Sequence, residues 1–275
     1  MEKCNFHTHT NFCDGKNTAE EMVLSALEKN FNALGFSSHS MFPFSGNWHI
    51  PSHDFISYTD EIKRLKEKYS DKIKIFTGFE CDYYPTLTFP DKEFYKELSP
   101  DYLIGSVHYI ANKKGHYSVD NSSERVKRGL NILYNGNGNK AVQEYFAAER
   151  DMIEKGNFDI LGHPDLIKIR NGELNFFNPN DSWYKKELKT LAKTAAKKGV
   201  IAEINTGGLA RNSIKDFYPS QELMEYFFEY KVPVCINSDA HKTEHLDFAF
   251  NEAKEMAKKI GYKELVYPCV RAVKI

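Results

Sequence analysis

The feature that most constrains the fold of this chain is the alternation of short apolar runs with amphipathic helical stretches along its 275 residues. Several of the apolar runs are continuous, as is typical of parallel strands that are buried on both faces. Strands that alternate with helices predict a parallel sheet covered by helices. Seven strands are expected, at residues 4–6, 33–37, 73–79, 102–107, 158–161, 200–204 and 232–236.

Caps and periodicity mark the helices between these strands. Thr18 followed three residues later by Glu21 is a capping-box pattern, which predicts the start of a helix. Apolar residues recur at helical spacing over residues 58–69 and 188–195, so each of these helices has one face for the core. A last helix is expected over residues 246–260.

Composition excludes several classes of function. A chain of this length with 41% hydrophobic residues can bury a sizeable core, so we expect one domain over residues 1–275. The formal net charge of −1 provides no basic field for a nucleic acid. The five cysteines include no CxxC pair, and no apolar run reaches the roughly 18 residues of a membrane helix. We expect a cytoplasmic protein with free thiols and with neither a nucleic-acid nor a membrane partner; composition predicts no oligomeric state.

Two long stretches interrupt the alternation, at residues 111–139 and 164–182. Each follows an expected strand that ends in a histidine. Connections of this length in a compact domain are usually functional loops or disordered segments. We expect the first of them to cover a bound substrate.

Ligand-type side chains follow six of the seven expected strands. The carboxyl ends of barrel strands converge on one face, so these side chains are expected to meet in one pocket. A strand-terminal histidine alone is more often structural, but agreement at six strand ends indicates a metal site. In chain order the residues are His7 and His9, His39, Glu80, His108, His163, and Asp239 with His241.

The spacing and chemistry of these residues indicate which ions they suit. His7 and His9 are two residues apart on an extended segment, so both side chains can point to one side and bind one ion. Asp239 and His241 repeat this spacing, and Glu80 is placed to bridge two ions. Mixed imidazole and carboxylate ligands suit zinc, manganese or iron, and the absence of thiolates argues against a cysteine-rich structural zinc site. We interpret the four other histidines as surface or loop residues: His49, His53, His116 and His245.

Several segments resemble the PHP family (polymerase and histidinol phosphatase), in family order and over nearly the whole chain. They are residues 5–10 (NFHTHT), 105–108 (GSVH), 162–165 (GHPD), 203–208 (EINTGG) and 238–241 (SDAH). The resemblance implies a distorted (β/α)7 TIM-like barrel with its active site at the C-terminal ends of the strands. It also implies three divalent metal ions.

The resemblance further implies how the ligands are shared among the three ions. By position, the first ion has His7, His9, Glu80 and Asp239, the second has Glu80, His108 and His163, and the third has Asp14, His39 and His241. Members of the family often have a histidine where this chain has Asp14, and Asp14-Gly15 is also an ordinary turn dipeptide. Many members have an acidic residue where Ser38 precedes His39, so that carboxylate is absent here.

Clustered divalent ions suit the hydrolysis of a small phosphate monoester. A hydroxide that bridges the metals is the expected nucleophile, and no DxDx motif suggests a phospho-enzyme. Asp239, His39 and Asp14 are the expected catalytic residues. Metal-bound water, His39 and Asp14 all remain possible donors of the proton that the leaving alcohol needs.

Further residues are expected to bind the substrate. Arg211 is the first choice for a phosphate clamp because guanidinium donors form a planar fork, and Lys168 and Arg170 are further choices. Tyr117 and Asp120 are placed to stack on an organic ring and to pair with an amine, although turn or surface roles are commoner for such residues.

The resemblance is narrowest to the histidinol-phosphate phosphatases of the family. It implies hydrolysis of L-histidinol phosphate to L-histidinol and inorganic phosphate, late in histidine biosynthesis. One alternative is a PHP phosphoesterase that acts on another small phosphate monoester or on a nucleotide. A non-catalytic metal-binding or regulatory module is a third hypothesis, which the intact ligand types at the strand ends disfavour.

Overall fold

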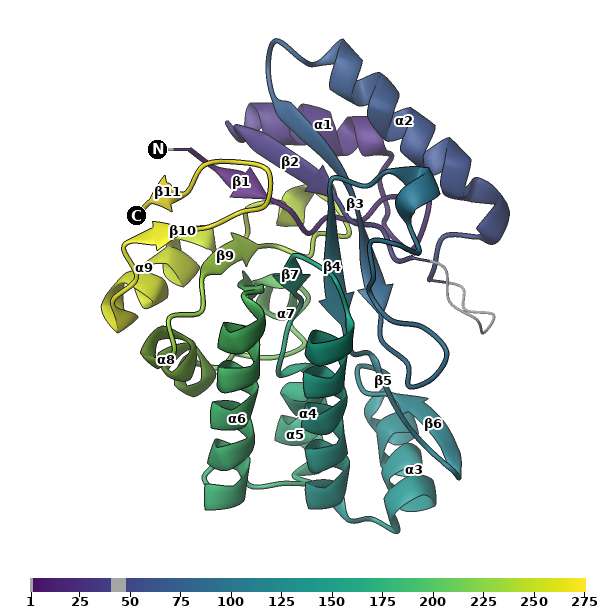
Figure 1. Ribbon diagram of the computed structural model, residues 1–275, viewed down its shortest axis with the longest axis vertical. Coiled ribbons are helices and arrows are strands. Elements are labelled where there is room, and N and C mark those ends of the chain that lie inside the picture. The colour runs from purple at the N-terminus through teal and green to yellow at the C-terminus, as the bar shows by residue number, and fades with distance from the viewer. Residues whose placement is uncertain (1, 41–47) are drawn as a thin grey trace.

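Seven parallel strands form one sheet that curls into a nearly closed barrel in the computed structural model, which describes residues 2–40 and 48–275 (Figure 1). Neighbouring strands in the barrel follow their order in the chain. They coincide with the seven predicted strands, with ends that shift by at most three residues, so the α/β barrel prediction is confirmed. The strands are β1 (Cys4–Asn5), β2 (Ala33–Phe36), β3 (Lys74–Asp82), β4 (Tyr102–Ser106), β7 (Ile160–Leu161), β8 (Ile201–Asn205) and β9 (Val234–Asn237).

The barrel closes between the first and last strands through a backbone bridge beyond their carboxyl ends. Thr8 pairs with Ala240 in parallel register, and the amide of His9 donates to the carbonyl of Ala240 over 2.9 Å. β1 and β7 have only two residues each, which makes the barrel irregular. Because the bridge lies between two ligand-bearing segments, it brings residues 7–9 beside residues 239–241.

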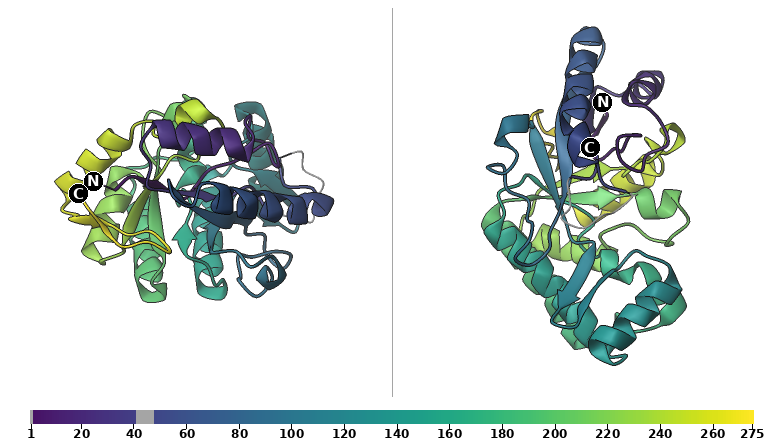
Figure 2. Two further views of the ribbon diagram at one scale, coloured as in Figure 1. Left: turned by 90° about the horizontal axis from the view of Figure 1, so that it is seen from above. Right: turned by 90° about the vertical axis from the view of Figure 1, so that its right-hand side faces the viewer.

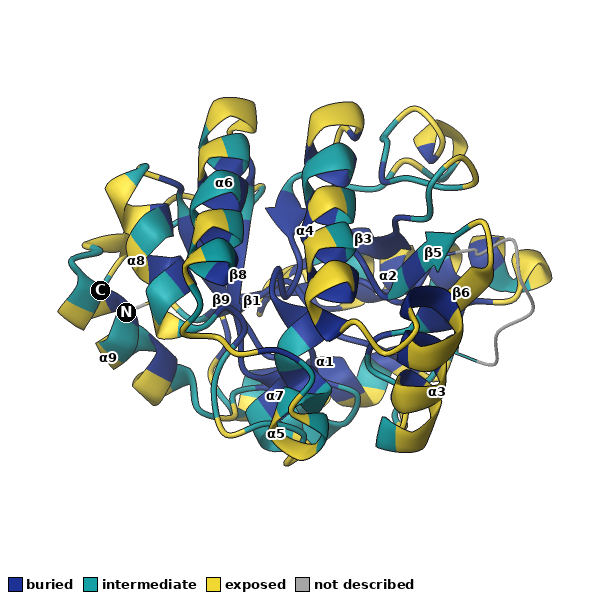
Figure 3. Cartoon of the chain, turned by 90° about the horizontal axis from the view of Figure 1, so that it is seen from below, coloured by how far each residue is buried: buried dark blue, intermediate teal, exposed yellow. Residues whose placement is uncertain are grey.

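Among residues 2–40 and 48–275, six helices cover the outside of the barrel, and Figure 3 shows helices with a buried face turned toward the strands and an exposed face turned away. The helix predicted after Thr18 begins with a capping box: the hydroxyl of Thr18 accepts from the amide of Glu21, whose carboxylate accepts from the amide of Thr18. The two chain ends lie side by side (Figure 2). The helices are α1 (Ala19–Glu28), α2 (Phe55–Lys68), α4 (Gly138–Lys155), α6 (Ser182–Lys198), α8 (Gln221–Glu229) and α9 (Phe250–Ile260).

The last helix is shorter than predicted. It begins at Phe250 instead of residue 246, because Ala249 adopts a left-handed conformation with φ of 54°. Leu246 is still buried, so its apolar character reflects packing outside the helix. The helix ends at Gly261, which has φ of 126° and donates its amide to the carbonyl of Ala257.

Tyr102 fills the interior of the barrel below the carboxyl ends of the strands. Its hydroxyl donates to the carbonyls of Phe6 and Phe36, at 2.7 and 3.0 Å, just before the segments that carry His7 and His39. A Cβ atom at Gly35 or Gly78 would lie 2.5 Å from this tyrosine, so both positions need glycine. The ring thus connects three strands directly beneath the ligand-bearing segments.

The two long stretches are ordered and contain elements that the sequence patterns did not predict. The first holds the hairpin β5 (Tyr109–Asn112) and β6 (Gly115–Ser118), followed by α3 (Ser123–Tyr134). The second holds a 3-10 helix, η3 (Leu166–Arg170), and α5 (Asn171–Leu174). The possibility that they are disordered is therefore wrong. The hairpin and η3 follow β4 and β7 directly, which places them beside the carboxyl end of the barrel.

The remaining elements are short. They are η1 (Ser52–Asp54), η2 (Lys96–Leu98), α7 (Gly207–Ala210), η4 (Thr243–His245) and the antiparallel pair β10 (Glu264–Leu265) and β11 (Val273–Lys274).

No helix among residues 2–40 and 48–275 is long and apolar enough to cross a membrane.

Candidate active site

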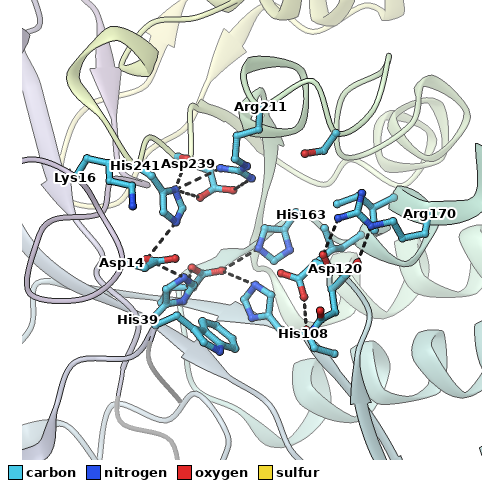
Figure 4. A pocket seen from close by; sticks show the side chains of 17 residues that line it. Asp14, Lys16, His39, His108, Asp120, His163, Arg170, Arg211, Asp239 and His241 are labelled. Carbon is cyan, nitrogen blue, oxygen red and sulfur yellow. Dashed lines mark hydrogen bonds and ion pairs between the residues drawn. The ribbon is translucent and has the colours of Figure 1, made fainter. Parts of the chain in front are cut away.

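The ligand-type residues gather at the carboxyl end of the barrel around a pocket of about 570 Å³ (Figure 4). Every strand that was expected to carry a ligand-type residue contributes at least one to this cluster. His7 and His9 are fully buried beside the pocket, where they approach the carboxylates of Glu80 and Asp239. The other members line the pocket itself: Asp14, His39, Glu80, His108, His163, Asp239 and His241.

Glu80 is the centre of this arrangement. Its Oε1 atom lies 2.9 Å from Nε2 of His163 and accepts a hydrogen bond from the hydroxyl of Ser106. Its Oε2 atom lies 3.1 Å from Nε2 of His7 and 3.1 Å from Nδ1 of His39. The two oxygens thus face different histidines, which is the geometry that a carboxylate bridging two ions requires.

The ligand atoms fall into four groups, within each of which all atoms lie within 4.8 Å of one another. Two groups reproduce the expected first and third ion sets, except that the first lacks Glu80 and the third also includes His9. The expected second set is divided, because His163 groups with His7 whereas His108 groups with His39. The groups are His9, Asp14, His39 and His241; His7, His9 and Asp239; His7, Glu80 and His163; and His39, Glu80 and His108.

Several of the candidate ligand atoms are buried without a hydrogen-bond partner in the described part of the chain, and a bound cation would supply the missing interaction. Among the residues that the structure describes, six buried atoms of these ligand-type side chains have no hydrogen-bond partner: Nε2 of His7, Nε2 of His9, Oδ1 of Asp14, Nδ1 of His39, Oε2 of Glu80 and Nδ1 of His163. Buried polar atoms are almost always hydrogen-bonded or bound to a metal, because their desolvation is otherwise costly. Imidazole and carboxylate donors so arranged fit several divalent ions.

A buried carboxylate that the sequence analysis did not assign orients His7. Glu203, in β8, has its Oε2 atom 2.9 Å from Nδ1 of His7, so Nε2 faces the other ligands. Burial disfavours a charged imidazole, but the carboxylates of Glu203, Glu80 and Asp239 outweigh it and raise the pKa of His7 well above its usual value. The excess of negative charge around His7 favours cation binding. Glu203 belongs to the family-like segment 203–208, and an acidic residue inside a buried strand was the available signal.

Asp82 has the same relationship to His108, and it also contacts His49. Oδ1 of Asp82 lies 2.5 Å from Nδ1 of His108, and Oδ2 lies 2.8 Å from Nε2 of His49. Burial opposes the charge on His108, but Asp82 and Glu80 raise its pKa to about 10. His49 lies in a loop, which agrees with its interpretation as a surface or loop residue, but it is buried and not on the surface.

Asp14 joins the expected third set although it follows no strand directly. Its Oδ1 atom lies 3.3 Å from Nε2 of His241 and 3.8 Å from Nε2 of His39. The pKa of Asp14 is lowered because these histidines outweigh the effect of burial. Gly15 lets the loop fold back, since a Cβ there would lie 2.6 Å from the amide nitrogen of Thr10. The turn dipeptide and the ligand position are therefore compatible.

Two strand-end residues have left-handed backbone conformations. His163 has φ of 24° and Asp239 has φ of 50°. Such conformations are costly for residues with a side chain, and they gather at functional sites where the surrounding structure enforces them. Both side chains point into the pocket (Figure 4).

Three cationic side chains line the pocket: Arg211, Arg170 and Lys16. The guanidinium of Arg211 donates to the carboxylate and the carbonyl of Asp239, at 2.8 and 2.9 Å. Arg170 donates to the carbonyls of Asn121 and Asp120. The sequence analysis missed Lys16, which forms no ion pair within residues 2–40 and 48–275. With cations bound at the ligand groups, these three side chains would suit the pocket to an anion.

Two of the expected substrate contacts lie outside the pocket lining. The ammonium of Lys168 is bound by Asp165 and Asp216, at 3.0 and 3.2 Å. Tyr117 precedes Ser118, which lines the pocket, and neighbouring residues of a strand face opposite sides. The ring of Tyr117 is therefore buried against Gly129 of α3. Asp120, by contrast, lines the pocket, and its carboxylate accepts a hydrogen bond from Ser118.

The sequence and the fold both match proteins of known family. The PHP domain family matches residues 5–207. A "Probable histidinol-phosphatase" of Deinococcus radiodurans is 26% identical over 271 residues, which cover 96% of each chain.

Two crystal structures share the fold. One is of a candidate histidinol phosphatase from Listeria monocytogenes, with a TM-score of 0.81, 22% identity and coverage of 91% of this chain and 99% of that one. The other is of histidinol phosphate phosphatase from Lactococcus lactis in complex with zinc, L-histidinol and phosphate, with a TM-score of 0.67, 21% identity and coverage of 99% of each chain. The barrel, the strand-end ligands and the match over residues 5–207 agree. This chain belongs to the PHP domain family.

Proposed function

We propose that the chain is a metal-dependent phosphatase that hydrolyses L-histidinol phosphate to L-histidinol and inorganic phosphate. The observation that carries the proposal is the set of four adjoining ligand groups, which open onto a pocket that also holds two arginines. The relatives named as histidinol-phosphatases support the choice of substrate. The Lactococcus lactis structure with zinc, L-histidinol and phosphate supports zinc as one of the candidate ions, beside manganese and iron.

When bound, clustered divalent ions lower the pKa of a coordinated water and neutralise charge on phosphoryl oxygens. The residues that would hold them are those of the four groups, with Glu80 between two of the sets. Glu203 and Asp82 keep His7 and His108 in fixed orientations. This support is the role that carboxylates commonly have behind ligating histidines.

We assign the two halves of the substrate to two sides of the pocket, on the basis of the residues outside the ligand groups. We assign the phosphate to the side of Arg211, whose guanidinium is fixed by Asp239 beside the ligands. We assign the amine to Asp120, because a carboxylate in the pocket suits an ammonium group. In Figure 4 Asp120 and Arg170 lie together, on the far side of His163 and His108 from Lys16 and Asp14. Metal-bound water, His39 and Asp14 all remain candidates for protonating the leaving alcohol.

The test combines metal analysis with a substrate panel. The purified protein is expected to contain more than one metal ion per chain and to prefer L-histidinol phosphate over p-nitrophenyl phosphate and a nucleoside monophosphate, measured as kcat/KM for phosphate release. Asp239→Ala should lower activity by orders of magnitude, whereas Glu255→Ala, at an exposed position of α9, is the matched control. Full activity of Asp239→Ala would overturn the site assignment. A strong preference for another ester would instead support a PHP phosphoesterase of different specificity.

A further inference from the structure

Trp48 lines the pocket and has no role in the assignments made so far. The centroid of its ring lies 4.7 Å from that of His39 and 5.3 Å from that of His108, in both cases nearly perpendicular. It also stacks on Tyr109, with centroids 5.9 Å apart and an angle of 21° between the planes. An indole therefore stands directly beside two of the candidate metal ligands.

The residues that follow Trp48 anchor it at this place. His49 is buried and lies 2.8 Å from the carboxylate of Asp82, and its ring packs on the indole with a centroid distance of 3.9 Å. The amide of Ile50 donates to the carbonyl of His39 over 3.0 Å. A side-chain bond and a backbone bond thus tie the segment to the ends of two barrel strands. A ring held in this way loses little freedom when a ligand stacks on it.

The charge in the same pocket indicates what kind of organic group would meet the indole. Asp120 is fixed by the hydroxyl of Ser118 at its carboxylate and by Arg170 at its carbonyl. Its negative charge favours ammonium and imidazolium groups and disfavours additional phosphates. The face of an indole attracts flat and cationic groups. An aromatic, positively charged organic half fits both features, whereas a polyphosphate or a polyol fits neither.

We propose that Trp48 determines specificity for the organic half of the substrate, by stacking on its nitrogen-containing ring. The inference rests on the proposed function, because it assumes a phosphate ester held at the metal ligands. His49 and Asp82 act as positioning residues, since they hold the segment that carries the indole. Tyr109 packs against the indole.

The kinetic test compares two esters that differ only in the ring. L-Alaninol phosphate keeps the amine and the phosphate of L-histidinol phosphate but lacks the imidazole. Trp48→Leu should lower the ratio of kcat/KM for L-histidinol phosphate over L-alaninol phosphate by about tenfold, through KM, which is the usual size of a stacking or cation–π contact. Trp48→Phe should keep the ratio within about threefold. An equal loss on both esters would overturn the proposal, because it would indicate a packing role only.

A binding measurement keeps the proposal testable if Trp48→Leu does not fold. The chain has two tryptophans, and Trp183 lies at the start of α6, where its indole nitrogen donates to Asp181. In a Trp183→Phe background, tryptophan emission reports on Trp48 alone. L-Histidinol added with inorganic phosphate should change this emission saturably, and L-alaninol should not. Identical responses to both alcohols would contradict the proposal.

The two measurements also separate this inference from the function on which it rests. If the unaltered protein releases phosphate from neither ester nor from any other member of the panel, the proposed function fails. If it hydrolyses both esters with the same kcat/KM, and Trp48→Leu does not change their ratio, the phosphatase assignment stands and the role of Trp48 fails.

Discussion

Nδ1 of His7 lies 2.9 Å from Oε2 of Glu203, and this contact leaves Nε2 of the same ring facing Glu80 and Asp239. Both partners are completely buried, so water does not compete for the bond. The amide of His163 also donates to Glu203, over 2.8 Å. A carboxylate in β8 therefore controls the orientation of a ligand that follows β1 and the backbone of another that follows β7.

Replacement of this carboxylate should weaken metal binding without removing a ligand. We expect Glu203→Ala to lower the affinity for zinc by about 10- to 100-fold, as changes behind ligating histidines usually do. Zinc titration of the metal-depleted protein measures this effect. Glu255→Ala is the surface control, and an unchanged zinc affinity of Glu203→Ala would contradict the orienting role.

Removal of the metal should reduce stability as well as activity. The ligand groups hold several buried carboxylates and histidines, whose charges are poorly compensated without cations. A ligand that binds only the folded chain stabilises it by mass action. We therefore expect a chelator to abolish phosphate release and to lower the Tm, and addition of zinc, manganese or iron to restore both. Chelator-resistant activity would instead favour chemistry that does not need a metal.

The loss of the guanidinium at Arg211 should affect phosphate binding most strongly. A hydrogen bond to a charged group contributes about 1.5–3 kcal/mol, so Arg211→Gln should lower kcat/KM about 10- to 100-fold. Arg64→Gln on the exposed face of α2 is the matched control, because Arg64 binds Glu20 and Glu61 there. Inorganic phosphate should also inhibit Arg211→Gln less than the unaltered protein. Equal inhibition of both would show that the phosphate lies elsewhere.

Glu149 should make the stability of the protein depend on pH. It is completely buried in α4, and burial raises the pKa of its carboxyl well above the usual value, although Tyr145 donates a hydrogen bond to it. The folded chain thus holds this carboxyl neutral, while the unfolded chain ionises it near the ordinary glutamate pKa of 4.5. The resulting loss of stability begins above that pH and grows until the folded pKa is reached, by at most about 1.4 kcal/mol per pH unit.

Glu149→Gln removes this ionisation and keeps an acceptor for Tyr145. We expect its advantage in free energy of unfolding over the unaltered protein to be larger at pH 7 than at pH 5. Urea denaturation at the two pH values measures the difference. A difference that does not change with pH would show that Glu149 is ionised in the folded protein.

Local patterns predicted most of the barrel, because strand and helix periodicity depend on neighbouring residues. The seven strands, the capping box at Thr18 and the position of the ligand types at the strand ends all follow from such patterns. Helix α3 also had a local signal: Ser122 caps it, and Val126, Leu130 and Leu133 recur at helical spacing. The length of the surrounding stretch and its Asn-Gly run, which are typical of loops, masked that signal.

Contacts between distant segments could not be predicted in the same way. His49 follows no strand, yet it is buried against Asp82, the last residue of β3. Lys168 has the positive charge that a phosphate clamp needs, but its ammonium group is paired with the buried carboxylate of Asp165. The direction of each side chain depends on packing that the order of residues does not show.

The sequence by itself determined that strands alternate with helices and that imidazoles and carboxylates follow the strands, because periodicity depends on neighbouring residues. The barrel was implied by the resemblance to the PHP family. Only the tertiary structure decided which donors lie within 4.8 Å of one another, how Glu80 is shared, and which of the predicted cations reach the pocket. Those outcomes depend on closure of the barrel, through the bridge between Thr8 and Ala240 beyond β1 and β9.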